Sequence, residues 1–233
     1  MCGRFTLTRQ NRRELAQLLG VDEDDLRDYK PRYNIAPTDQ HFIVTSQYER
    51  RTARTASWGL VNSWATDNTR ASQCINAKAE TLEERRSFRE AFFQRRCVVP
   101  ADGFYEWRGP KAQREPVWIH PADGGLLLFA RLYEAWQARR GDWQWTFTII
   151  TTVANALLKP IHDRMPVILN ERAAEDWMNP NEAQPKRLKR LLSPAPEAKL
   201  LITPASPLVN SVKNDGPELL DNQIARGQQL RLM

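Results

Sequence analysis

Apolar residues recur at helical spacing in two segments of the chain. Residues 8–20 place three leucines on one face and end at Gly20, a typical helix stop. Residues 79–96 carry one leucine and three phenylalanines as a stripe among charged residues, which predicts the clearest helix of the protein. Shorter helices are expected at 154–162, at 171–179 and within the basic stretch 179–199.

Short apolar runs bounded by turn-forming residues predict the strands. These runs are 41–46, 56–61, 97–107, 116–120, 125–136, 143–152, 166–170 and 200–206. The polar segment 21–40 is expected to be a loop. Because strands are scattered and helices lie between them irregularly, we expect an α+β fold with a mostly antiparallel, barrel-like β-sheet core and peripheral helices.

The composition is that of a folded protein with a sizeable core. Hydrophobic residues make up 41% of the 233 residues and charged residues 27%. No repeat, low-complexity segment or long linker divides the chain, so a single domain is expected. The net charge of +6 is compatible with a nucleic-acid partner and equally with ordinary surface charge.

The three cysteines have neither disulfide nor metal-site spacing, which favours a reducing compartment. The three histidines are equally scattered, so we expect no metal ion, and no phosphate-loop or dinucleotide motif suggests a cofactor. The first residues lack an apolar signal segment, and no apolar run is long enough to span a bilayer. We therefore expect a cytoplasmic protein with no membrane partner.

Cys2 follows Met1 directly, an unusual place for a thiol. If Met1 is removed, Cys2 carries a free α-amine and a thiol on one residue. The amine can form an imine with an aldehyde, and the thiol can then close on the imine carbon to give a five-membered thiazolidine. With a reference pKa of about 7.7–8.0, the amine is partly neutral at neutral pH. The alternative is a cysteine that is second in the chain by chance.

Three polar residues near Cys2 or near a strand end could accompany such chemistry. In an extended start Arg4 shares a face with Cys2, where it could hold a phosphate. In an extended segment Asn76 and Lys78 share a side; Asn76 could orient a carbonyl or hydroxyl, and Lys78 could meet a phosphate. A helix-entry turn, where asparagine is common, is the alternative for this segment.

Glu106 and His162 are candidates for proton transfer. Glu106 lies between Tyr105 and Trp107 on a predicted strand, where desolvation would raise its pKa as a general acid requires. An outward-facing strand glutamate is the alternative. His162 lies in a polar loop beside an acid and a base, the placement of a catalytic histidine, although a lone histidine often has no such role.

Eight tryptophans in a basic chain suggest stacking on unpaired bases. Trp58 and Trp64 flank a loop that could present an aromatic ring, and exposed aromatics with basic grooves are how proteins hold single strands. Most of the eight must nevertheless belong to the core.

Seven stretches in this order resemble one family, the SOS response-associated peptidase (SRAP) family, which shields abasic sites in single-stranded DNA. They are MCGRF at 1–5, RYNIAP at 32–37, WG at 58–59, INAKAET at 75–81, ADGFYEW at 101–107, IHDRMP at 161–166 and VKN at 212–214. The resemblance implies one SRAP domain over 1–225 with a tail at 226–233. It also implies a monomer that is associated with the nucleoid when it is bound to abasic single-stranded DNA.

The resemblance implies a role for each matched catalytic residue. Cys2 would form the thiazolidine with the ring-opened aldehyde of an abasic site, and Asn76 would orient the abasic deoxyribose. Glu106 would be the general acid/base in ring opening and around the imine. His162 would assist ring opening and the Schiff-base steps, including reversal of the crosslink.

The resemblance also implies eight DNA contacts. Phosphates would be clamped by Arg4, Lys78 and Arg164. Flanking bases would be wedged or stacked by Pro37 and Trp64. Lesser contacts are expected from Asn34, Thr151 and Lys213. The sequence departs from the family pattern where Lys78 replaces the usual arginine, which loses bidentate phosphate geometry. It departs again where Ala65 follows Trp64, since some relatives carry a second tryptophan there.

Two other functions stay open. The protein could be a cysteine peptidase with Cys2 as an N-terminal nucleophile, acting on peptides in general or on its own Met1 alone. It could instead be a non-catalytic single-stranded DNA-binding module, driven by positive charge and stacking aromatics.

Overall fold

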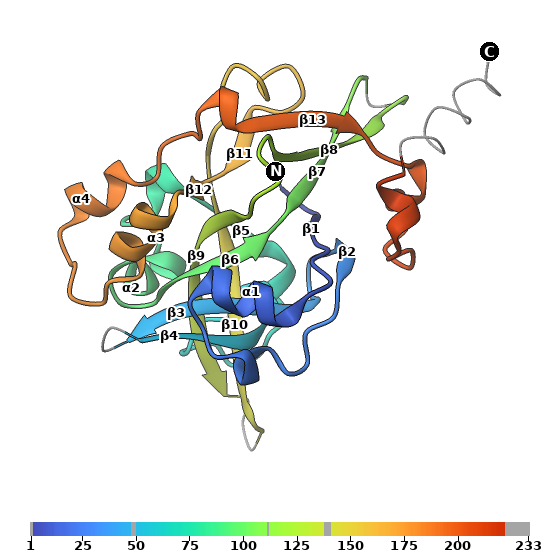
Figure 1. Ribbon diagram of the computed structural model, residues 1–233. Coiled ribbons are helices and arrows are strands. Elements are labelled where there is room, and N and C mark those ends of the chain that lie inside the picture. Colours follow the sequence, from blue (N-terminus) through green and yellow to red (C-terminus); the bar gives the residue numbers. More distant parts are fainter. Residues whose placement is uncertain (1, 48–49, 111, 138–140, 222–233) are drawn as a thin grey trace, which may run out of the picture.

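The computed structural model describes residues 2–47, 50–110, 112–137 and 141–221. Strands form the middle of the molecule and short helices lie around them (Figure 1). The strands are β1 (Phe5–Leu7), β2 (Arg32–Ile35), β3 (Gln40–Gln47), β4 (Arg50–Trp58), β5 (Asn76–Lys78), β6 (Arg96–Ala101), β7 (Gly103–Arg108), β8 (Glu115–Pro121), β9 (Leu127–Gln137), β10 (Trp143–Val153), β11 (Arg164–Pro166), β12 (Ile168–Leu169) and β13 (Leu200–Pro204). The α-helices are α1 (Arg12–Leu19), α2 (Arg86–Gln94), α3 (Glu171–Met178) and α4 (Pro185–Arg190).

Five strands close into a barrel. Their order is β10–β4–β3–β6–β9, and the ring closes because β9 pairs with β10 from Gln137↔Trp143 to Arg131↔Ile149. All neighbours are antiparallel except β4 and β10, which run parallel. Closure leaves these strands without free edges. The expected α+β fold with a mostly antiparallel, barrel-like core is confirmed; the expected boundary at 225/226 lies outside the described residues.

A second sheet, in the order β13–β8–β7–β1–β2, brings the N-terminal strand onto the barrel. β1 lies between β7 and β2, with Phe5 opposite both Phe104 and Ile35. The first residue of β7 is Gly103. The indole of Trp118 lies directly over this residue, so any Cβ there would collide with the ring. The start of the chain is therefore an inner strand held on both sides.

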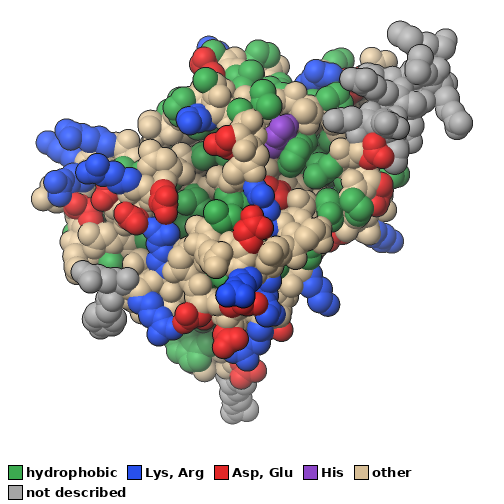
Figure 2. All heavy atoms as spheres, viewed as in Figure 1, with side chains coloured by type: hydrophobic (Ala, Val, Ile, Leu, Met, Phe, Trp, Pro, Cys, Tyr) green, Lys and Arg blue, Asp and Glu red, His purple; other side chains and the backbone are tan. Residues whose placement is uncertain are grey.

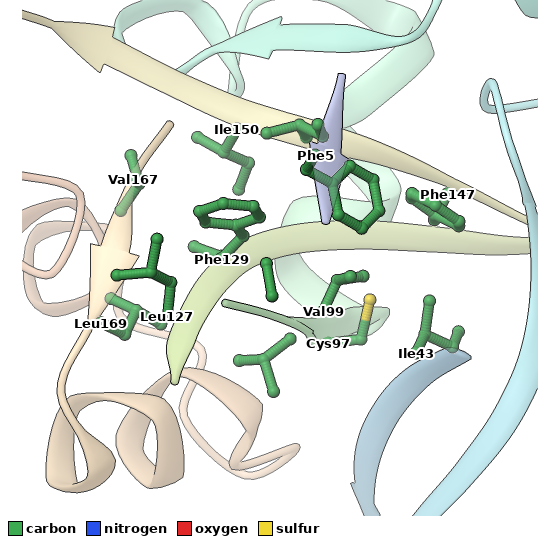
Figure 3. Close-up of a cluster of buried hydrophobic side chains, with 14 of the residues drawn as sticks. Phe5, Ile43, Cys97, Val99, Leu127, Phe129, Phe147, Ile150, Val167 and Leu169 are labelled. Atoms are coloured by element: carbon green, nitrogen blue, oxygen red, sulfur yellow. The ribbon is translucent and has the colours of Figure 1, made fainter. Parts of the chain in front are cut away.

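The barrel interior is filled by aromatic and aliphatic side chains from both sheets (Figure 3). Phe5 from β1 packs edge-on against Trp58 and Phe129, with ring centroids 5.2 and 6.0 Å apart. Both Phe5 and Phe129 are fully buried. Burial of such rings supplies much of the stability of a core and ties β1 to the barrel.

The three helices predicted at 8–20, at 171–179 and within 179–199 form as expected. α1 is capped by the Asn11 side chain, which accepts from the Glu14 amide, and ends at Gly20 with φ of 65°. α3 begins after Asn170, whose side chain accepts from the Ala173 amide. The basic helix within 179–199 is α4. The capping residues were sufficient to predict where α1 and α3 begin, because each cap accepts a hydrogen bond from an amide within the first turn of its helix.

The helix predicted over 79–96 was wrong in its first half. Lys78 pairs with Thr151 of β10, and a 3₁₀ turn at Ala79–Thr81 then buries Leu82 before α2 begins at Arg86. The helix predicted at 154–162 was also wrong. That segment is a series of turns, because Pro160 has no amide proton to continue a helical hydrogen-bond ladder.

Two strand predictions and one loop prediction needed correction. The run 56–61 is a strand only as far as Trp58, where β4 ends. The run 97–107 is two strands, β6 and β7, which separate at Asp102 and enter different sheets. The Asp102 carboxylate accepts from the Thr6 hydroxyl at 2.5 Å and the Thr8 amide at 2.5 Å, so it fixes the corner against β1. The segment expected to be a loop, 21–40, contains β2, which pairs with β1.

Candidate active site

Cys2 and Asn76 come together although they are 74 residues apart in the chain. Cys2 lies three residues before β1, and its side chain is fully buried. Asn76 opens β5, which runs parallel to β10 with Asn76 opposite Ile149. The Asn76 side-chain amide donates to the Cys2 carbonyl oxygen at 3.1 Å. Of the two alternatives that the sequence left open here, an extended segment or a helix-entry turn, the structure has the extended one as β5, and its first side chain holds the backbone of Cys2.

Glu106 is a buried carboxyl on β7 next to this pair. Its residue is 5% exposed, and burial raises its pKa to about 7. Glu106 is one of the charges that raise the pKa of Cys2, and Asp163 in turn raises the pKa of Glu106. The Glu106 carboxyl is therefore coupled electrostatically both to Cys2 and to the turn that carries His162. A carboxyl near neutrality can both give and take a proton.

His162 lies in the turn before β11, with its side chain 30% exposed. Its Nδ1 accepts from the Arg164 amide at 2.9 Å and lies 2.8 Å from an Asp163 carboxylate oxygen. Burial is the main cause that lowers the pKa of His162 below its ordinary value, so the neutral ring dominates at pH 7.

Burial keeps Cys2 in its thiol form. It raises the pKa of Cys2 to about 12, and the nearby Glu106 carboxylate acts in the same direction. The Arg131 guanidinium opposes both and lowers the pKa of Cys2. The arrangement therefore contains a buried thiol, a carboxyl titrating near neutrality and a neutral imidazole.

The Arg4 side chain is held by Asn34 of β2 and by a carbonyl of segment 209–214. Its Nη1 donates to Asn34 Oδ1 at 2.9 Å and to the Val209 carbonyl at 2.8 Å. Asn34 is fully buried and donates to the carbonyls of Ser211 and Asn214 at 3.0 and 2.8 Å. Asn34 thus faces the protein interior, where it fixes Arg4 against segment 209–214.

Arg164 is bound by an acidic neighbour. It forms two parallel hydrogen bonds with the Glu80 carboxylate, at 2.7 and 2.9 Å, and its side chain is 11% exposed. Its Nη2 also donates to the Thr151 carbonyl at 2.5 Å. Thr151 itself is fully buried, so its contact is with Arg164. Lys78, on β5, is exposed.

The remaining expected contacts lie at the surface. Trp64 is 52% exposed and the Arg86 guanidinium lies 4.5 Å from its ring centre, whereas Trp58 is fully buried. Pro37 is half-buried and precedes Thr38, whose φ of 77° is strained for a β-branched residue. Lys213 is exposed. Of the two tryptophans considered from the sequence, Trp64 is the one that can stack on a ligand.

Two acidic residues that organise the site were missed in the sequence. Glu80 was within the motif INAKAET, two positions after Lys78, and its role became visible only through Arg164. Asp215 follows VKN directly and accepts from the amides of Tyr33 and Asn34 at 2.6 and 2.8 Å.

In the described residues no three histidine, cysteine, aspartate or glutamate side chains are placed to hold a metal ion. The same residues include no helix long and apolar enough to cross a membrane.

Three curated relatives match most of this chain. The abasic site processing protein YoqW of Bacillus subtilis is 39% identical over 225 residues, which covers 95% of this chain and 100% of YoqW. The abasic site processing protein YedK of Escherichia coli is 31% identical over 226 residues, covering 94% and 99%. The abasic site processing protein HMCES of Xenopus tropicalis is 28% identical over 229 residues, covering 85% and 68%.

The fold also matches solved structures. A crystal structure of a protein from Bacteroides thetaiotaomicron superposes with a TM-score of 0.84 at 25% identity, over 94% of this chain and 99% of that one. The family model described as SOS response associated peptidase (SRAP) matches residues 1–212, which include Cys2, the barrel, Glu106 and the His162 turn. The chain therefore belongs to the SRAP family.

Proposed function

We propose that this protein captures abasic sites in single-stranded DNA through a thiazolidine at Cys2. The observation that supports it most is the meeting of Cys2 with Asn76 beside Glu106, a carboxyl whose pKa lies near neutrality. The relatives YoqW, YedK and HMCES are named as abasic site processing proteins. An abasic site exposes an aldehyde when its sugar ring opens, and an aminothiol is the group that traps it in two steps.

The proposed reaction balances without an oxidant. The Cys2 α-amine adds to the aldehyde carbon, and water leaves to form the imine. The sulfur then bonds to the imine carbon, the C=N electron pair moves to nitrogen, and the thiol proton ends on that nitrogen. Because both groups belong to one residue, ring closure is intramolecular. The reaction requires the free amine of Cys2 and therefore removal of Met1.

Glu106 and His162 supply the proton transfers in this proposal. Neutral His162 takes the proton of the sugar hydroxyl as the ring opens. Protonated Glu106 gives a proton to the departing oxygen when the imine forms, and its carboxylate receives one in the return direction. Asn76, which already holds the Cys2 backbone, orients the open sugar. The same groups could run the steps backwards and release the DNA.

The DNA path follows the cations and the exposed ring around Cys2. Arg4, Lys78 and Arg164 contact phosphates, while Trp64 and Pro37 meet the flanking bases, with Lys213 at the margin. Asn34 and Thr151 are buried and act on DNA through Arg4 and Arg164, which they hold.

Purified protein incubated with a single strand carrying one abasic site tests the proposal. We expect a covalent adduct that survives heating on a denaturing gel, and none with the undamaged strand. Mass spectrometry should place the adduct on the peptide that begins with Cys2, and the intact protein should lack Met1. Absence of the adduct from protein that has lost Met1 would contradict the proposal.

Lys78→Ala should weaken binding of undamaged and abasic single strands equally. The exposed ammonium contacts a phosphate, so its loss should reduce the slope of log affinity against log salt by about 1. Fluorescence anisotropy over a salt series measures this. Lys186→Ala is the control, because Lys186 belongs to α4, a helix that carries none of the site residues. Lys and Arg side chains gather at the left of Figure 2, where Figure 1 labels α4. A loss of affinity equal to that of Lys186→Ala would contradict the assignment of Lys78.

A second candidate function is a thiol peptidase with Cys2 as the nucleophile, which the word peptidase in the family description favours. Turnover of peptides in trans that depends on Cys2 would support it. Binding that is indifferent to both the lesion and Cys2 would instead indicate a non-catalytic DNA-binding module.

A further inference from the structure

Arg32 is the first residue of β2, and its guanidinium binds two carboxylates at once. Its Nη2 donates to Asp39 Oδ2 at 2.8 Å, and its Nε donates to Asp215 Oδ2. Asp39 is seven residues away in the chain, whereas Asp215 is 183 residues away. About a third of the Arg32 side chain is exposed, and ion pairs at such positions contribute little to stability. What matters is therefore what each carboxylate holds.

The Asp39 carboxylate fixes the turn that carries Pro37. Its Oδ2 accepts from the Ala36 amide at 3.1 Å, and the Asp39 amide donates to the Ala36 carbonyl at 3.1 Å. The Thr38 amide donates to the Trp58 carbonyl at 2.8 Å, which ties the turn to the end of β4. Thr38 has a φ of 77°, which a β-branched residue keeps only where its surroundings enforce it. Asp39 is thus part of the set of contacts that determines where Pro37 lies.

The Asp215 carboxylate anchors the residues that fix Arg4. Its Oδ1 accepts from the backbone amides of Tyr33 and Asn34 at 2.6 and 2.8 Å. Segment 209–214 directly precedes Asp215 and lies beside β2, at the right of Figure 1. Asn34 and a carbonyl of this segment accept both hydrogen bonds of Arg4 Nη1. Asp215 therefore ties the support of Arg4 to β2.

Arg32 is the group that joins these two assemblies. We propose that Arg32 is a positioning residue, which sets the spacing between Pro37 and Arg4 through its two carboxylates, so that a DNA single strand meets both at once. The inference rests on the proposed function, in which Pro37 meets a flanking base and Arg4 a phosphate. A planar guanidinium suits this role, because its donors point in fixed directions, whereas an ammonium is a compact point charge on a flexible stem.

Arg32→Lys tests the inference at constant charge. One ammonium cannot hold both carboxylates in a fixed geometry. The affinity for an undamaged single strand, measured by fluorescence anisotropy, should fall about tenfold, which is within the range that coupled residues of one network show. Arg12→Lys is the matched control. Arg12 also donates through Nε and Nη2 to a carboxylate, that of Glu23, but it supports none of the proposed DNA contacts, so its change should leave the affinity unaltered.

Asp39→Asn is a second variant, which leaves Arg32 in place. Asparagine keeps the shape of the side chain but loses the negative charge that pairs with Arg32. Removal of a negative charge by itself strengthens binding to DNA, whereas loss of the link to Arg32 should weaken it. We expect weaker binding. In the double variant Arg32→Lys/Asp39→Asn the two losses should not multiply, because both break the same link.

Two readouts separate positioning from direct contact and from a merely structural role. In an Arg4→Ala/Pro37→Ala background, Arg32→Lys should change the affinity less than about twofold, because neither supported contact remains. In single-turnover adduct formation, Arg32→Lys should raise the half-saturating concentration of abasic strand by the factor lost in affinity. The rate at saturation should stay at the wild-type value, since Cys2 and Glu106 are untouched.

Each outcome decides. Wild-type affinity in Arg32→Lys, an equal loss in Arg12→Lys, or a loss that persists in the Arg4→Ala/Pro37→Ala background would overturn the inference. If the wild type forms no adduct with abasic DNA but the variants show the expected coupling in single-strand binding, the proposed function fails and the positioning role stands. If the adduct forms while Arg32→Lys binds like the wild type, the reverse holds. Absence of single-strand binding by the wild type would overturn both.

Discussion

Cys2→Ala should abolish the heat-stable adduct with abasic single-stranded DNA. Without sulfur, the terminal amine can still form an imine, but the imine cannot close to a ring and hydrolyses. The Cys2 side chain is fully buried beside Asn76, and alanine leaves only a small space there, so the fold should persist. The measurement is a denaturing gel after heating, with and without reduction of the imine beforehand.

Cys74→Ala is the matched control for this experiment. Cys74 is a half-buried cysteine outside the site, so its loss should leave the adduct unchanged. Cys2→Ser should behave like Cys2→Ala, because an oxygen analogue closes on the imine less stably. Trapping of an imine by reduction in Cys2→Ala would show that the amine alone still finds the aldehyde. An unreduced heat-stable adduct in that variant would contradict the thiazolidine.

Glu106→Gln should slow adduct formation by about 100-fold. A positioned general acid or base contributes about 10² to 10⁴ to a rate, and glutamine keeps the shape without a transferable proton. Burial raises the pKa of Glu106 to about 7. If its protonated form limits imine formation, the wild-type rate should fall as the pH rises above neutrality, and the variant should lack this decline. Single-turnover rates from pH 5.5 to about 9 measure both.

The same substitution should change stability in the opposite sense to activity. An acid whose pKa is raised on folding binds its proton more tightly in the native state, so the fold loses stability as the pH rises from the ordinary pKa of the group through about 7. Glu106→Gln removes this loss. At pH 8, above this window, the variant should therefore unfold at a higher temperature than the wild type, whereas below the window the two should be similar.

Glu115→Gln is the control for this pair of measurements. Glu115 is an exposed glutamate at the start of β8, the strand that pairs with β7, and its change should affect neither the rate nor the pH profile. A Glu106→Gln variant with a wild-type rate at every pH would exclude proton transfer by Glu106. A variant destabilised at pH 8 would instead assign to the carboxylate a structural role that glutamine cannot fill.

Local patterns predicted the helices whose apolar face and terminating residues lie within one short stretch of the chain. α1 was predictable because its leucine face and Gly20 lie within thirteen residues of chain at 8–20, and α3 because its apolar face is equally short. The helix at 79–96 failed in its first half because strand pairing at Lys78 with Thr151, seventy-odd residues away, overrides the local preference. The run 97–107 was divided between two sheets by Asp102, whose partners Thr6 and Thr8 are equally remote.

The sequence by itself determined the strand-rich α+β class, the placement of a cysteine directly after Met1 and the motifs that resemble the SRAP family, because each is written in short stretches of residue types. Only the tertiary structure decided which of those residues meet. It closed the barrel through β9 and β10, buried Asn34 under Arg4, set Glu80 on Arg164 and joined Asp39 to Asp215 through Arg32. Burial and the fields of distant charges arise from packing, so the pKa values of Cys2 and Glu106 could not be inferred from neighbours in sequence.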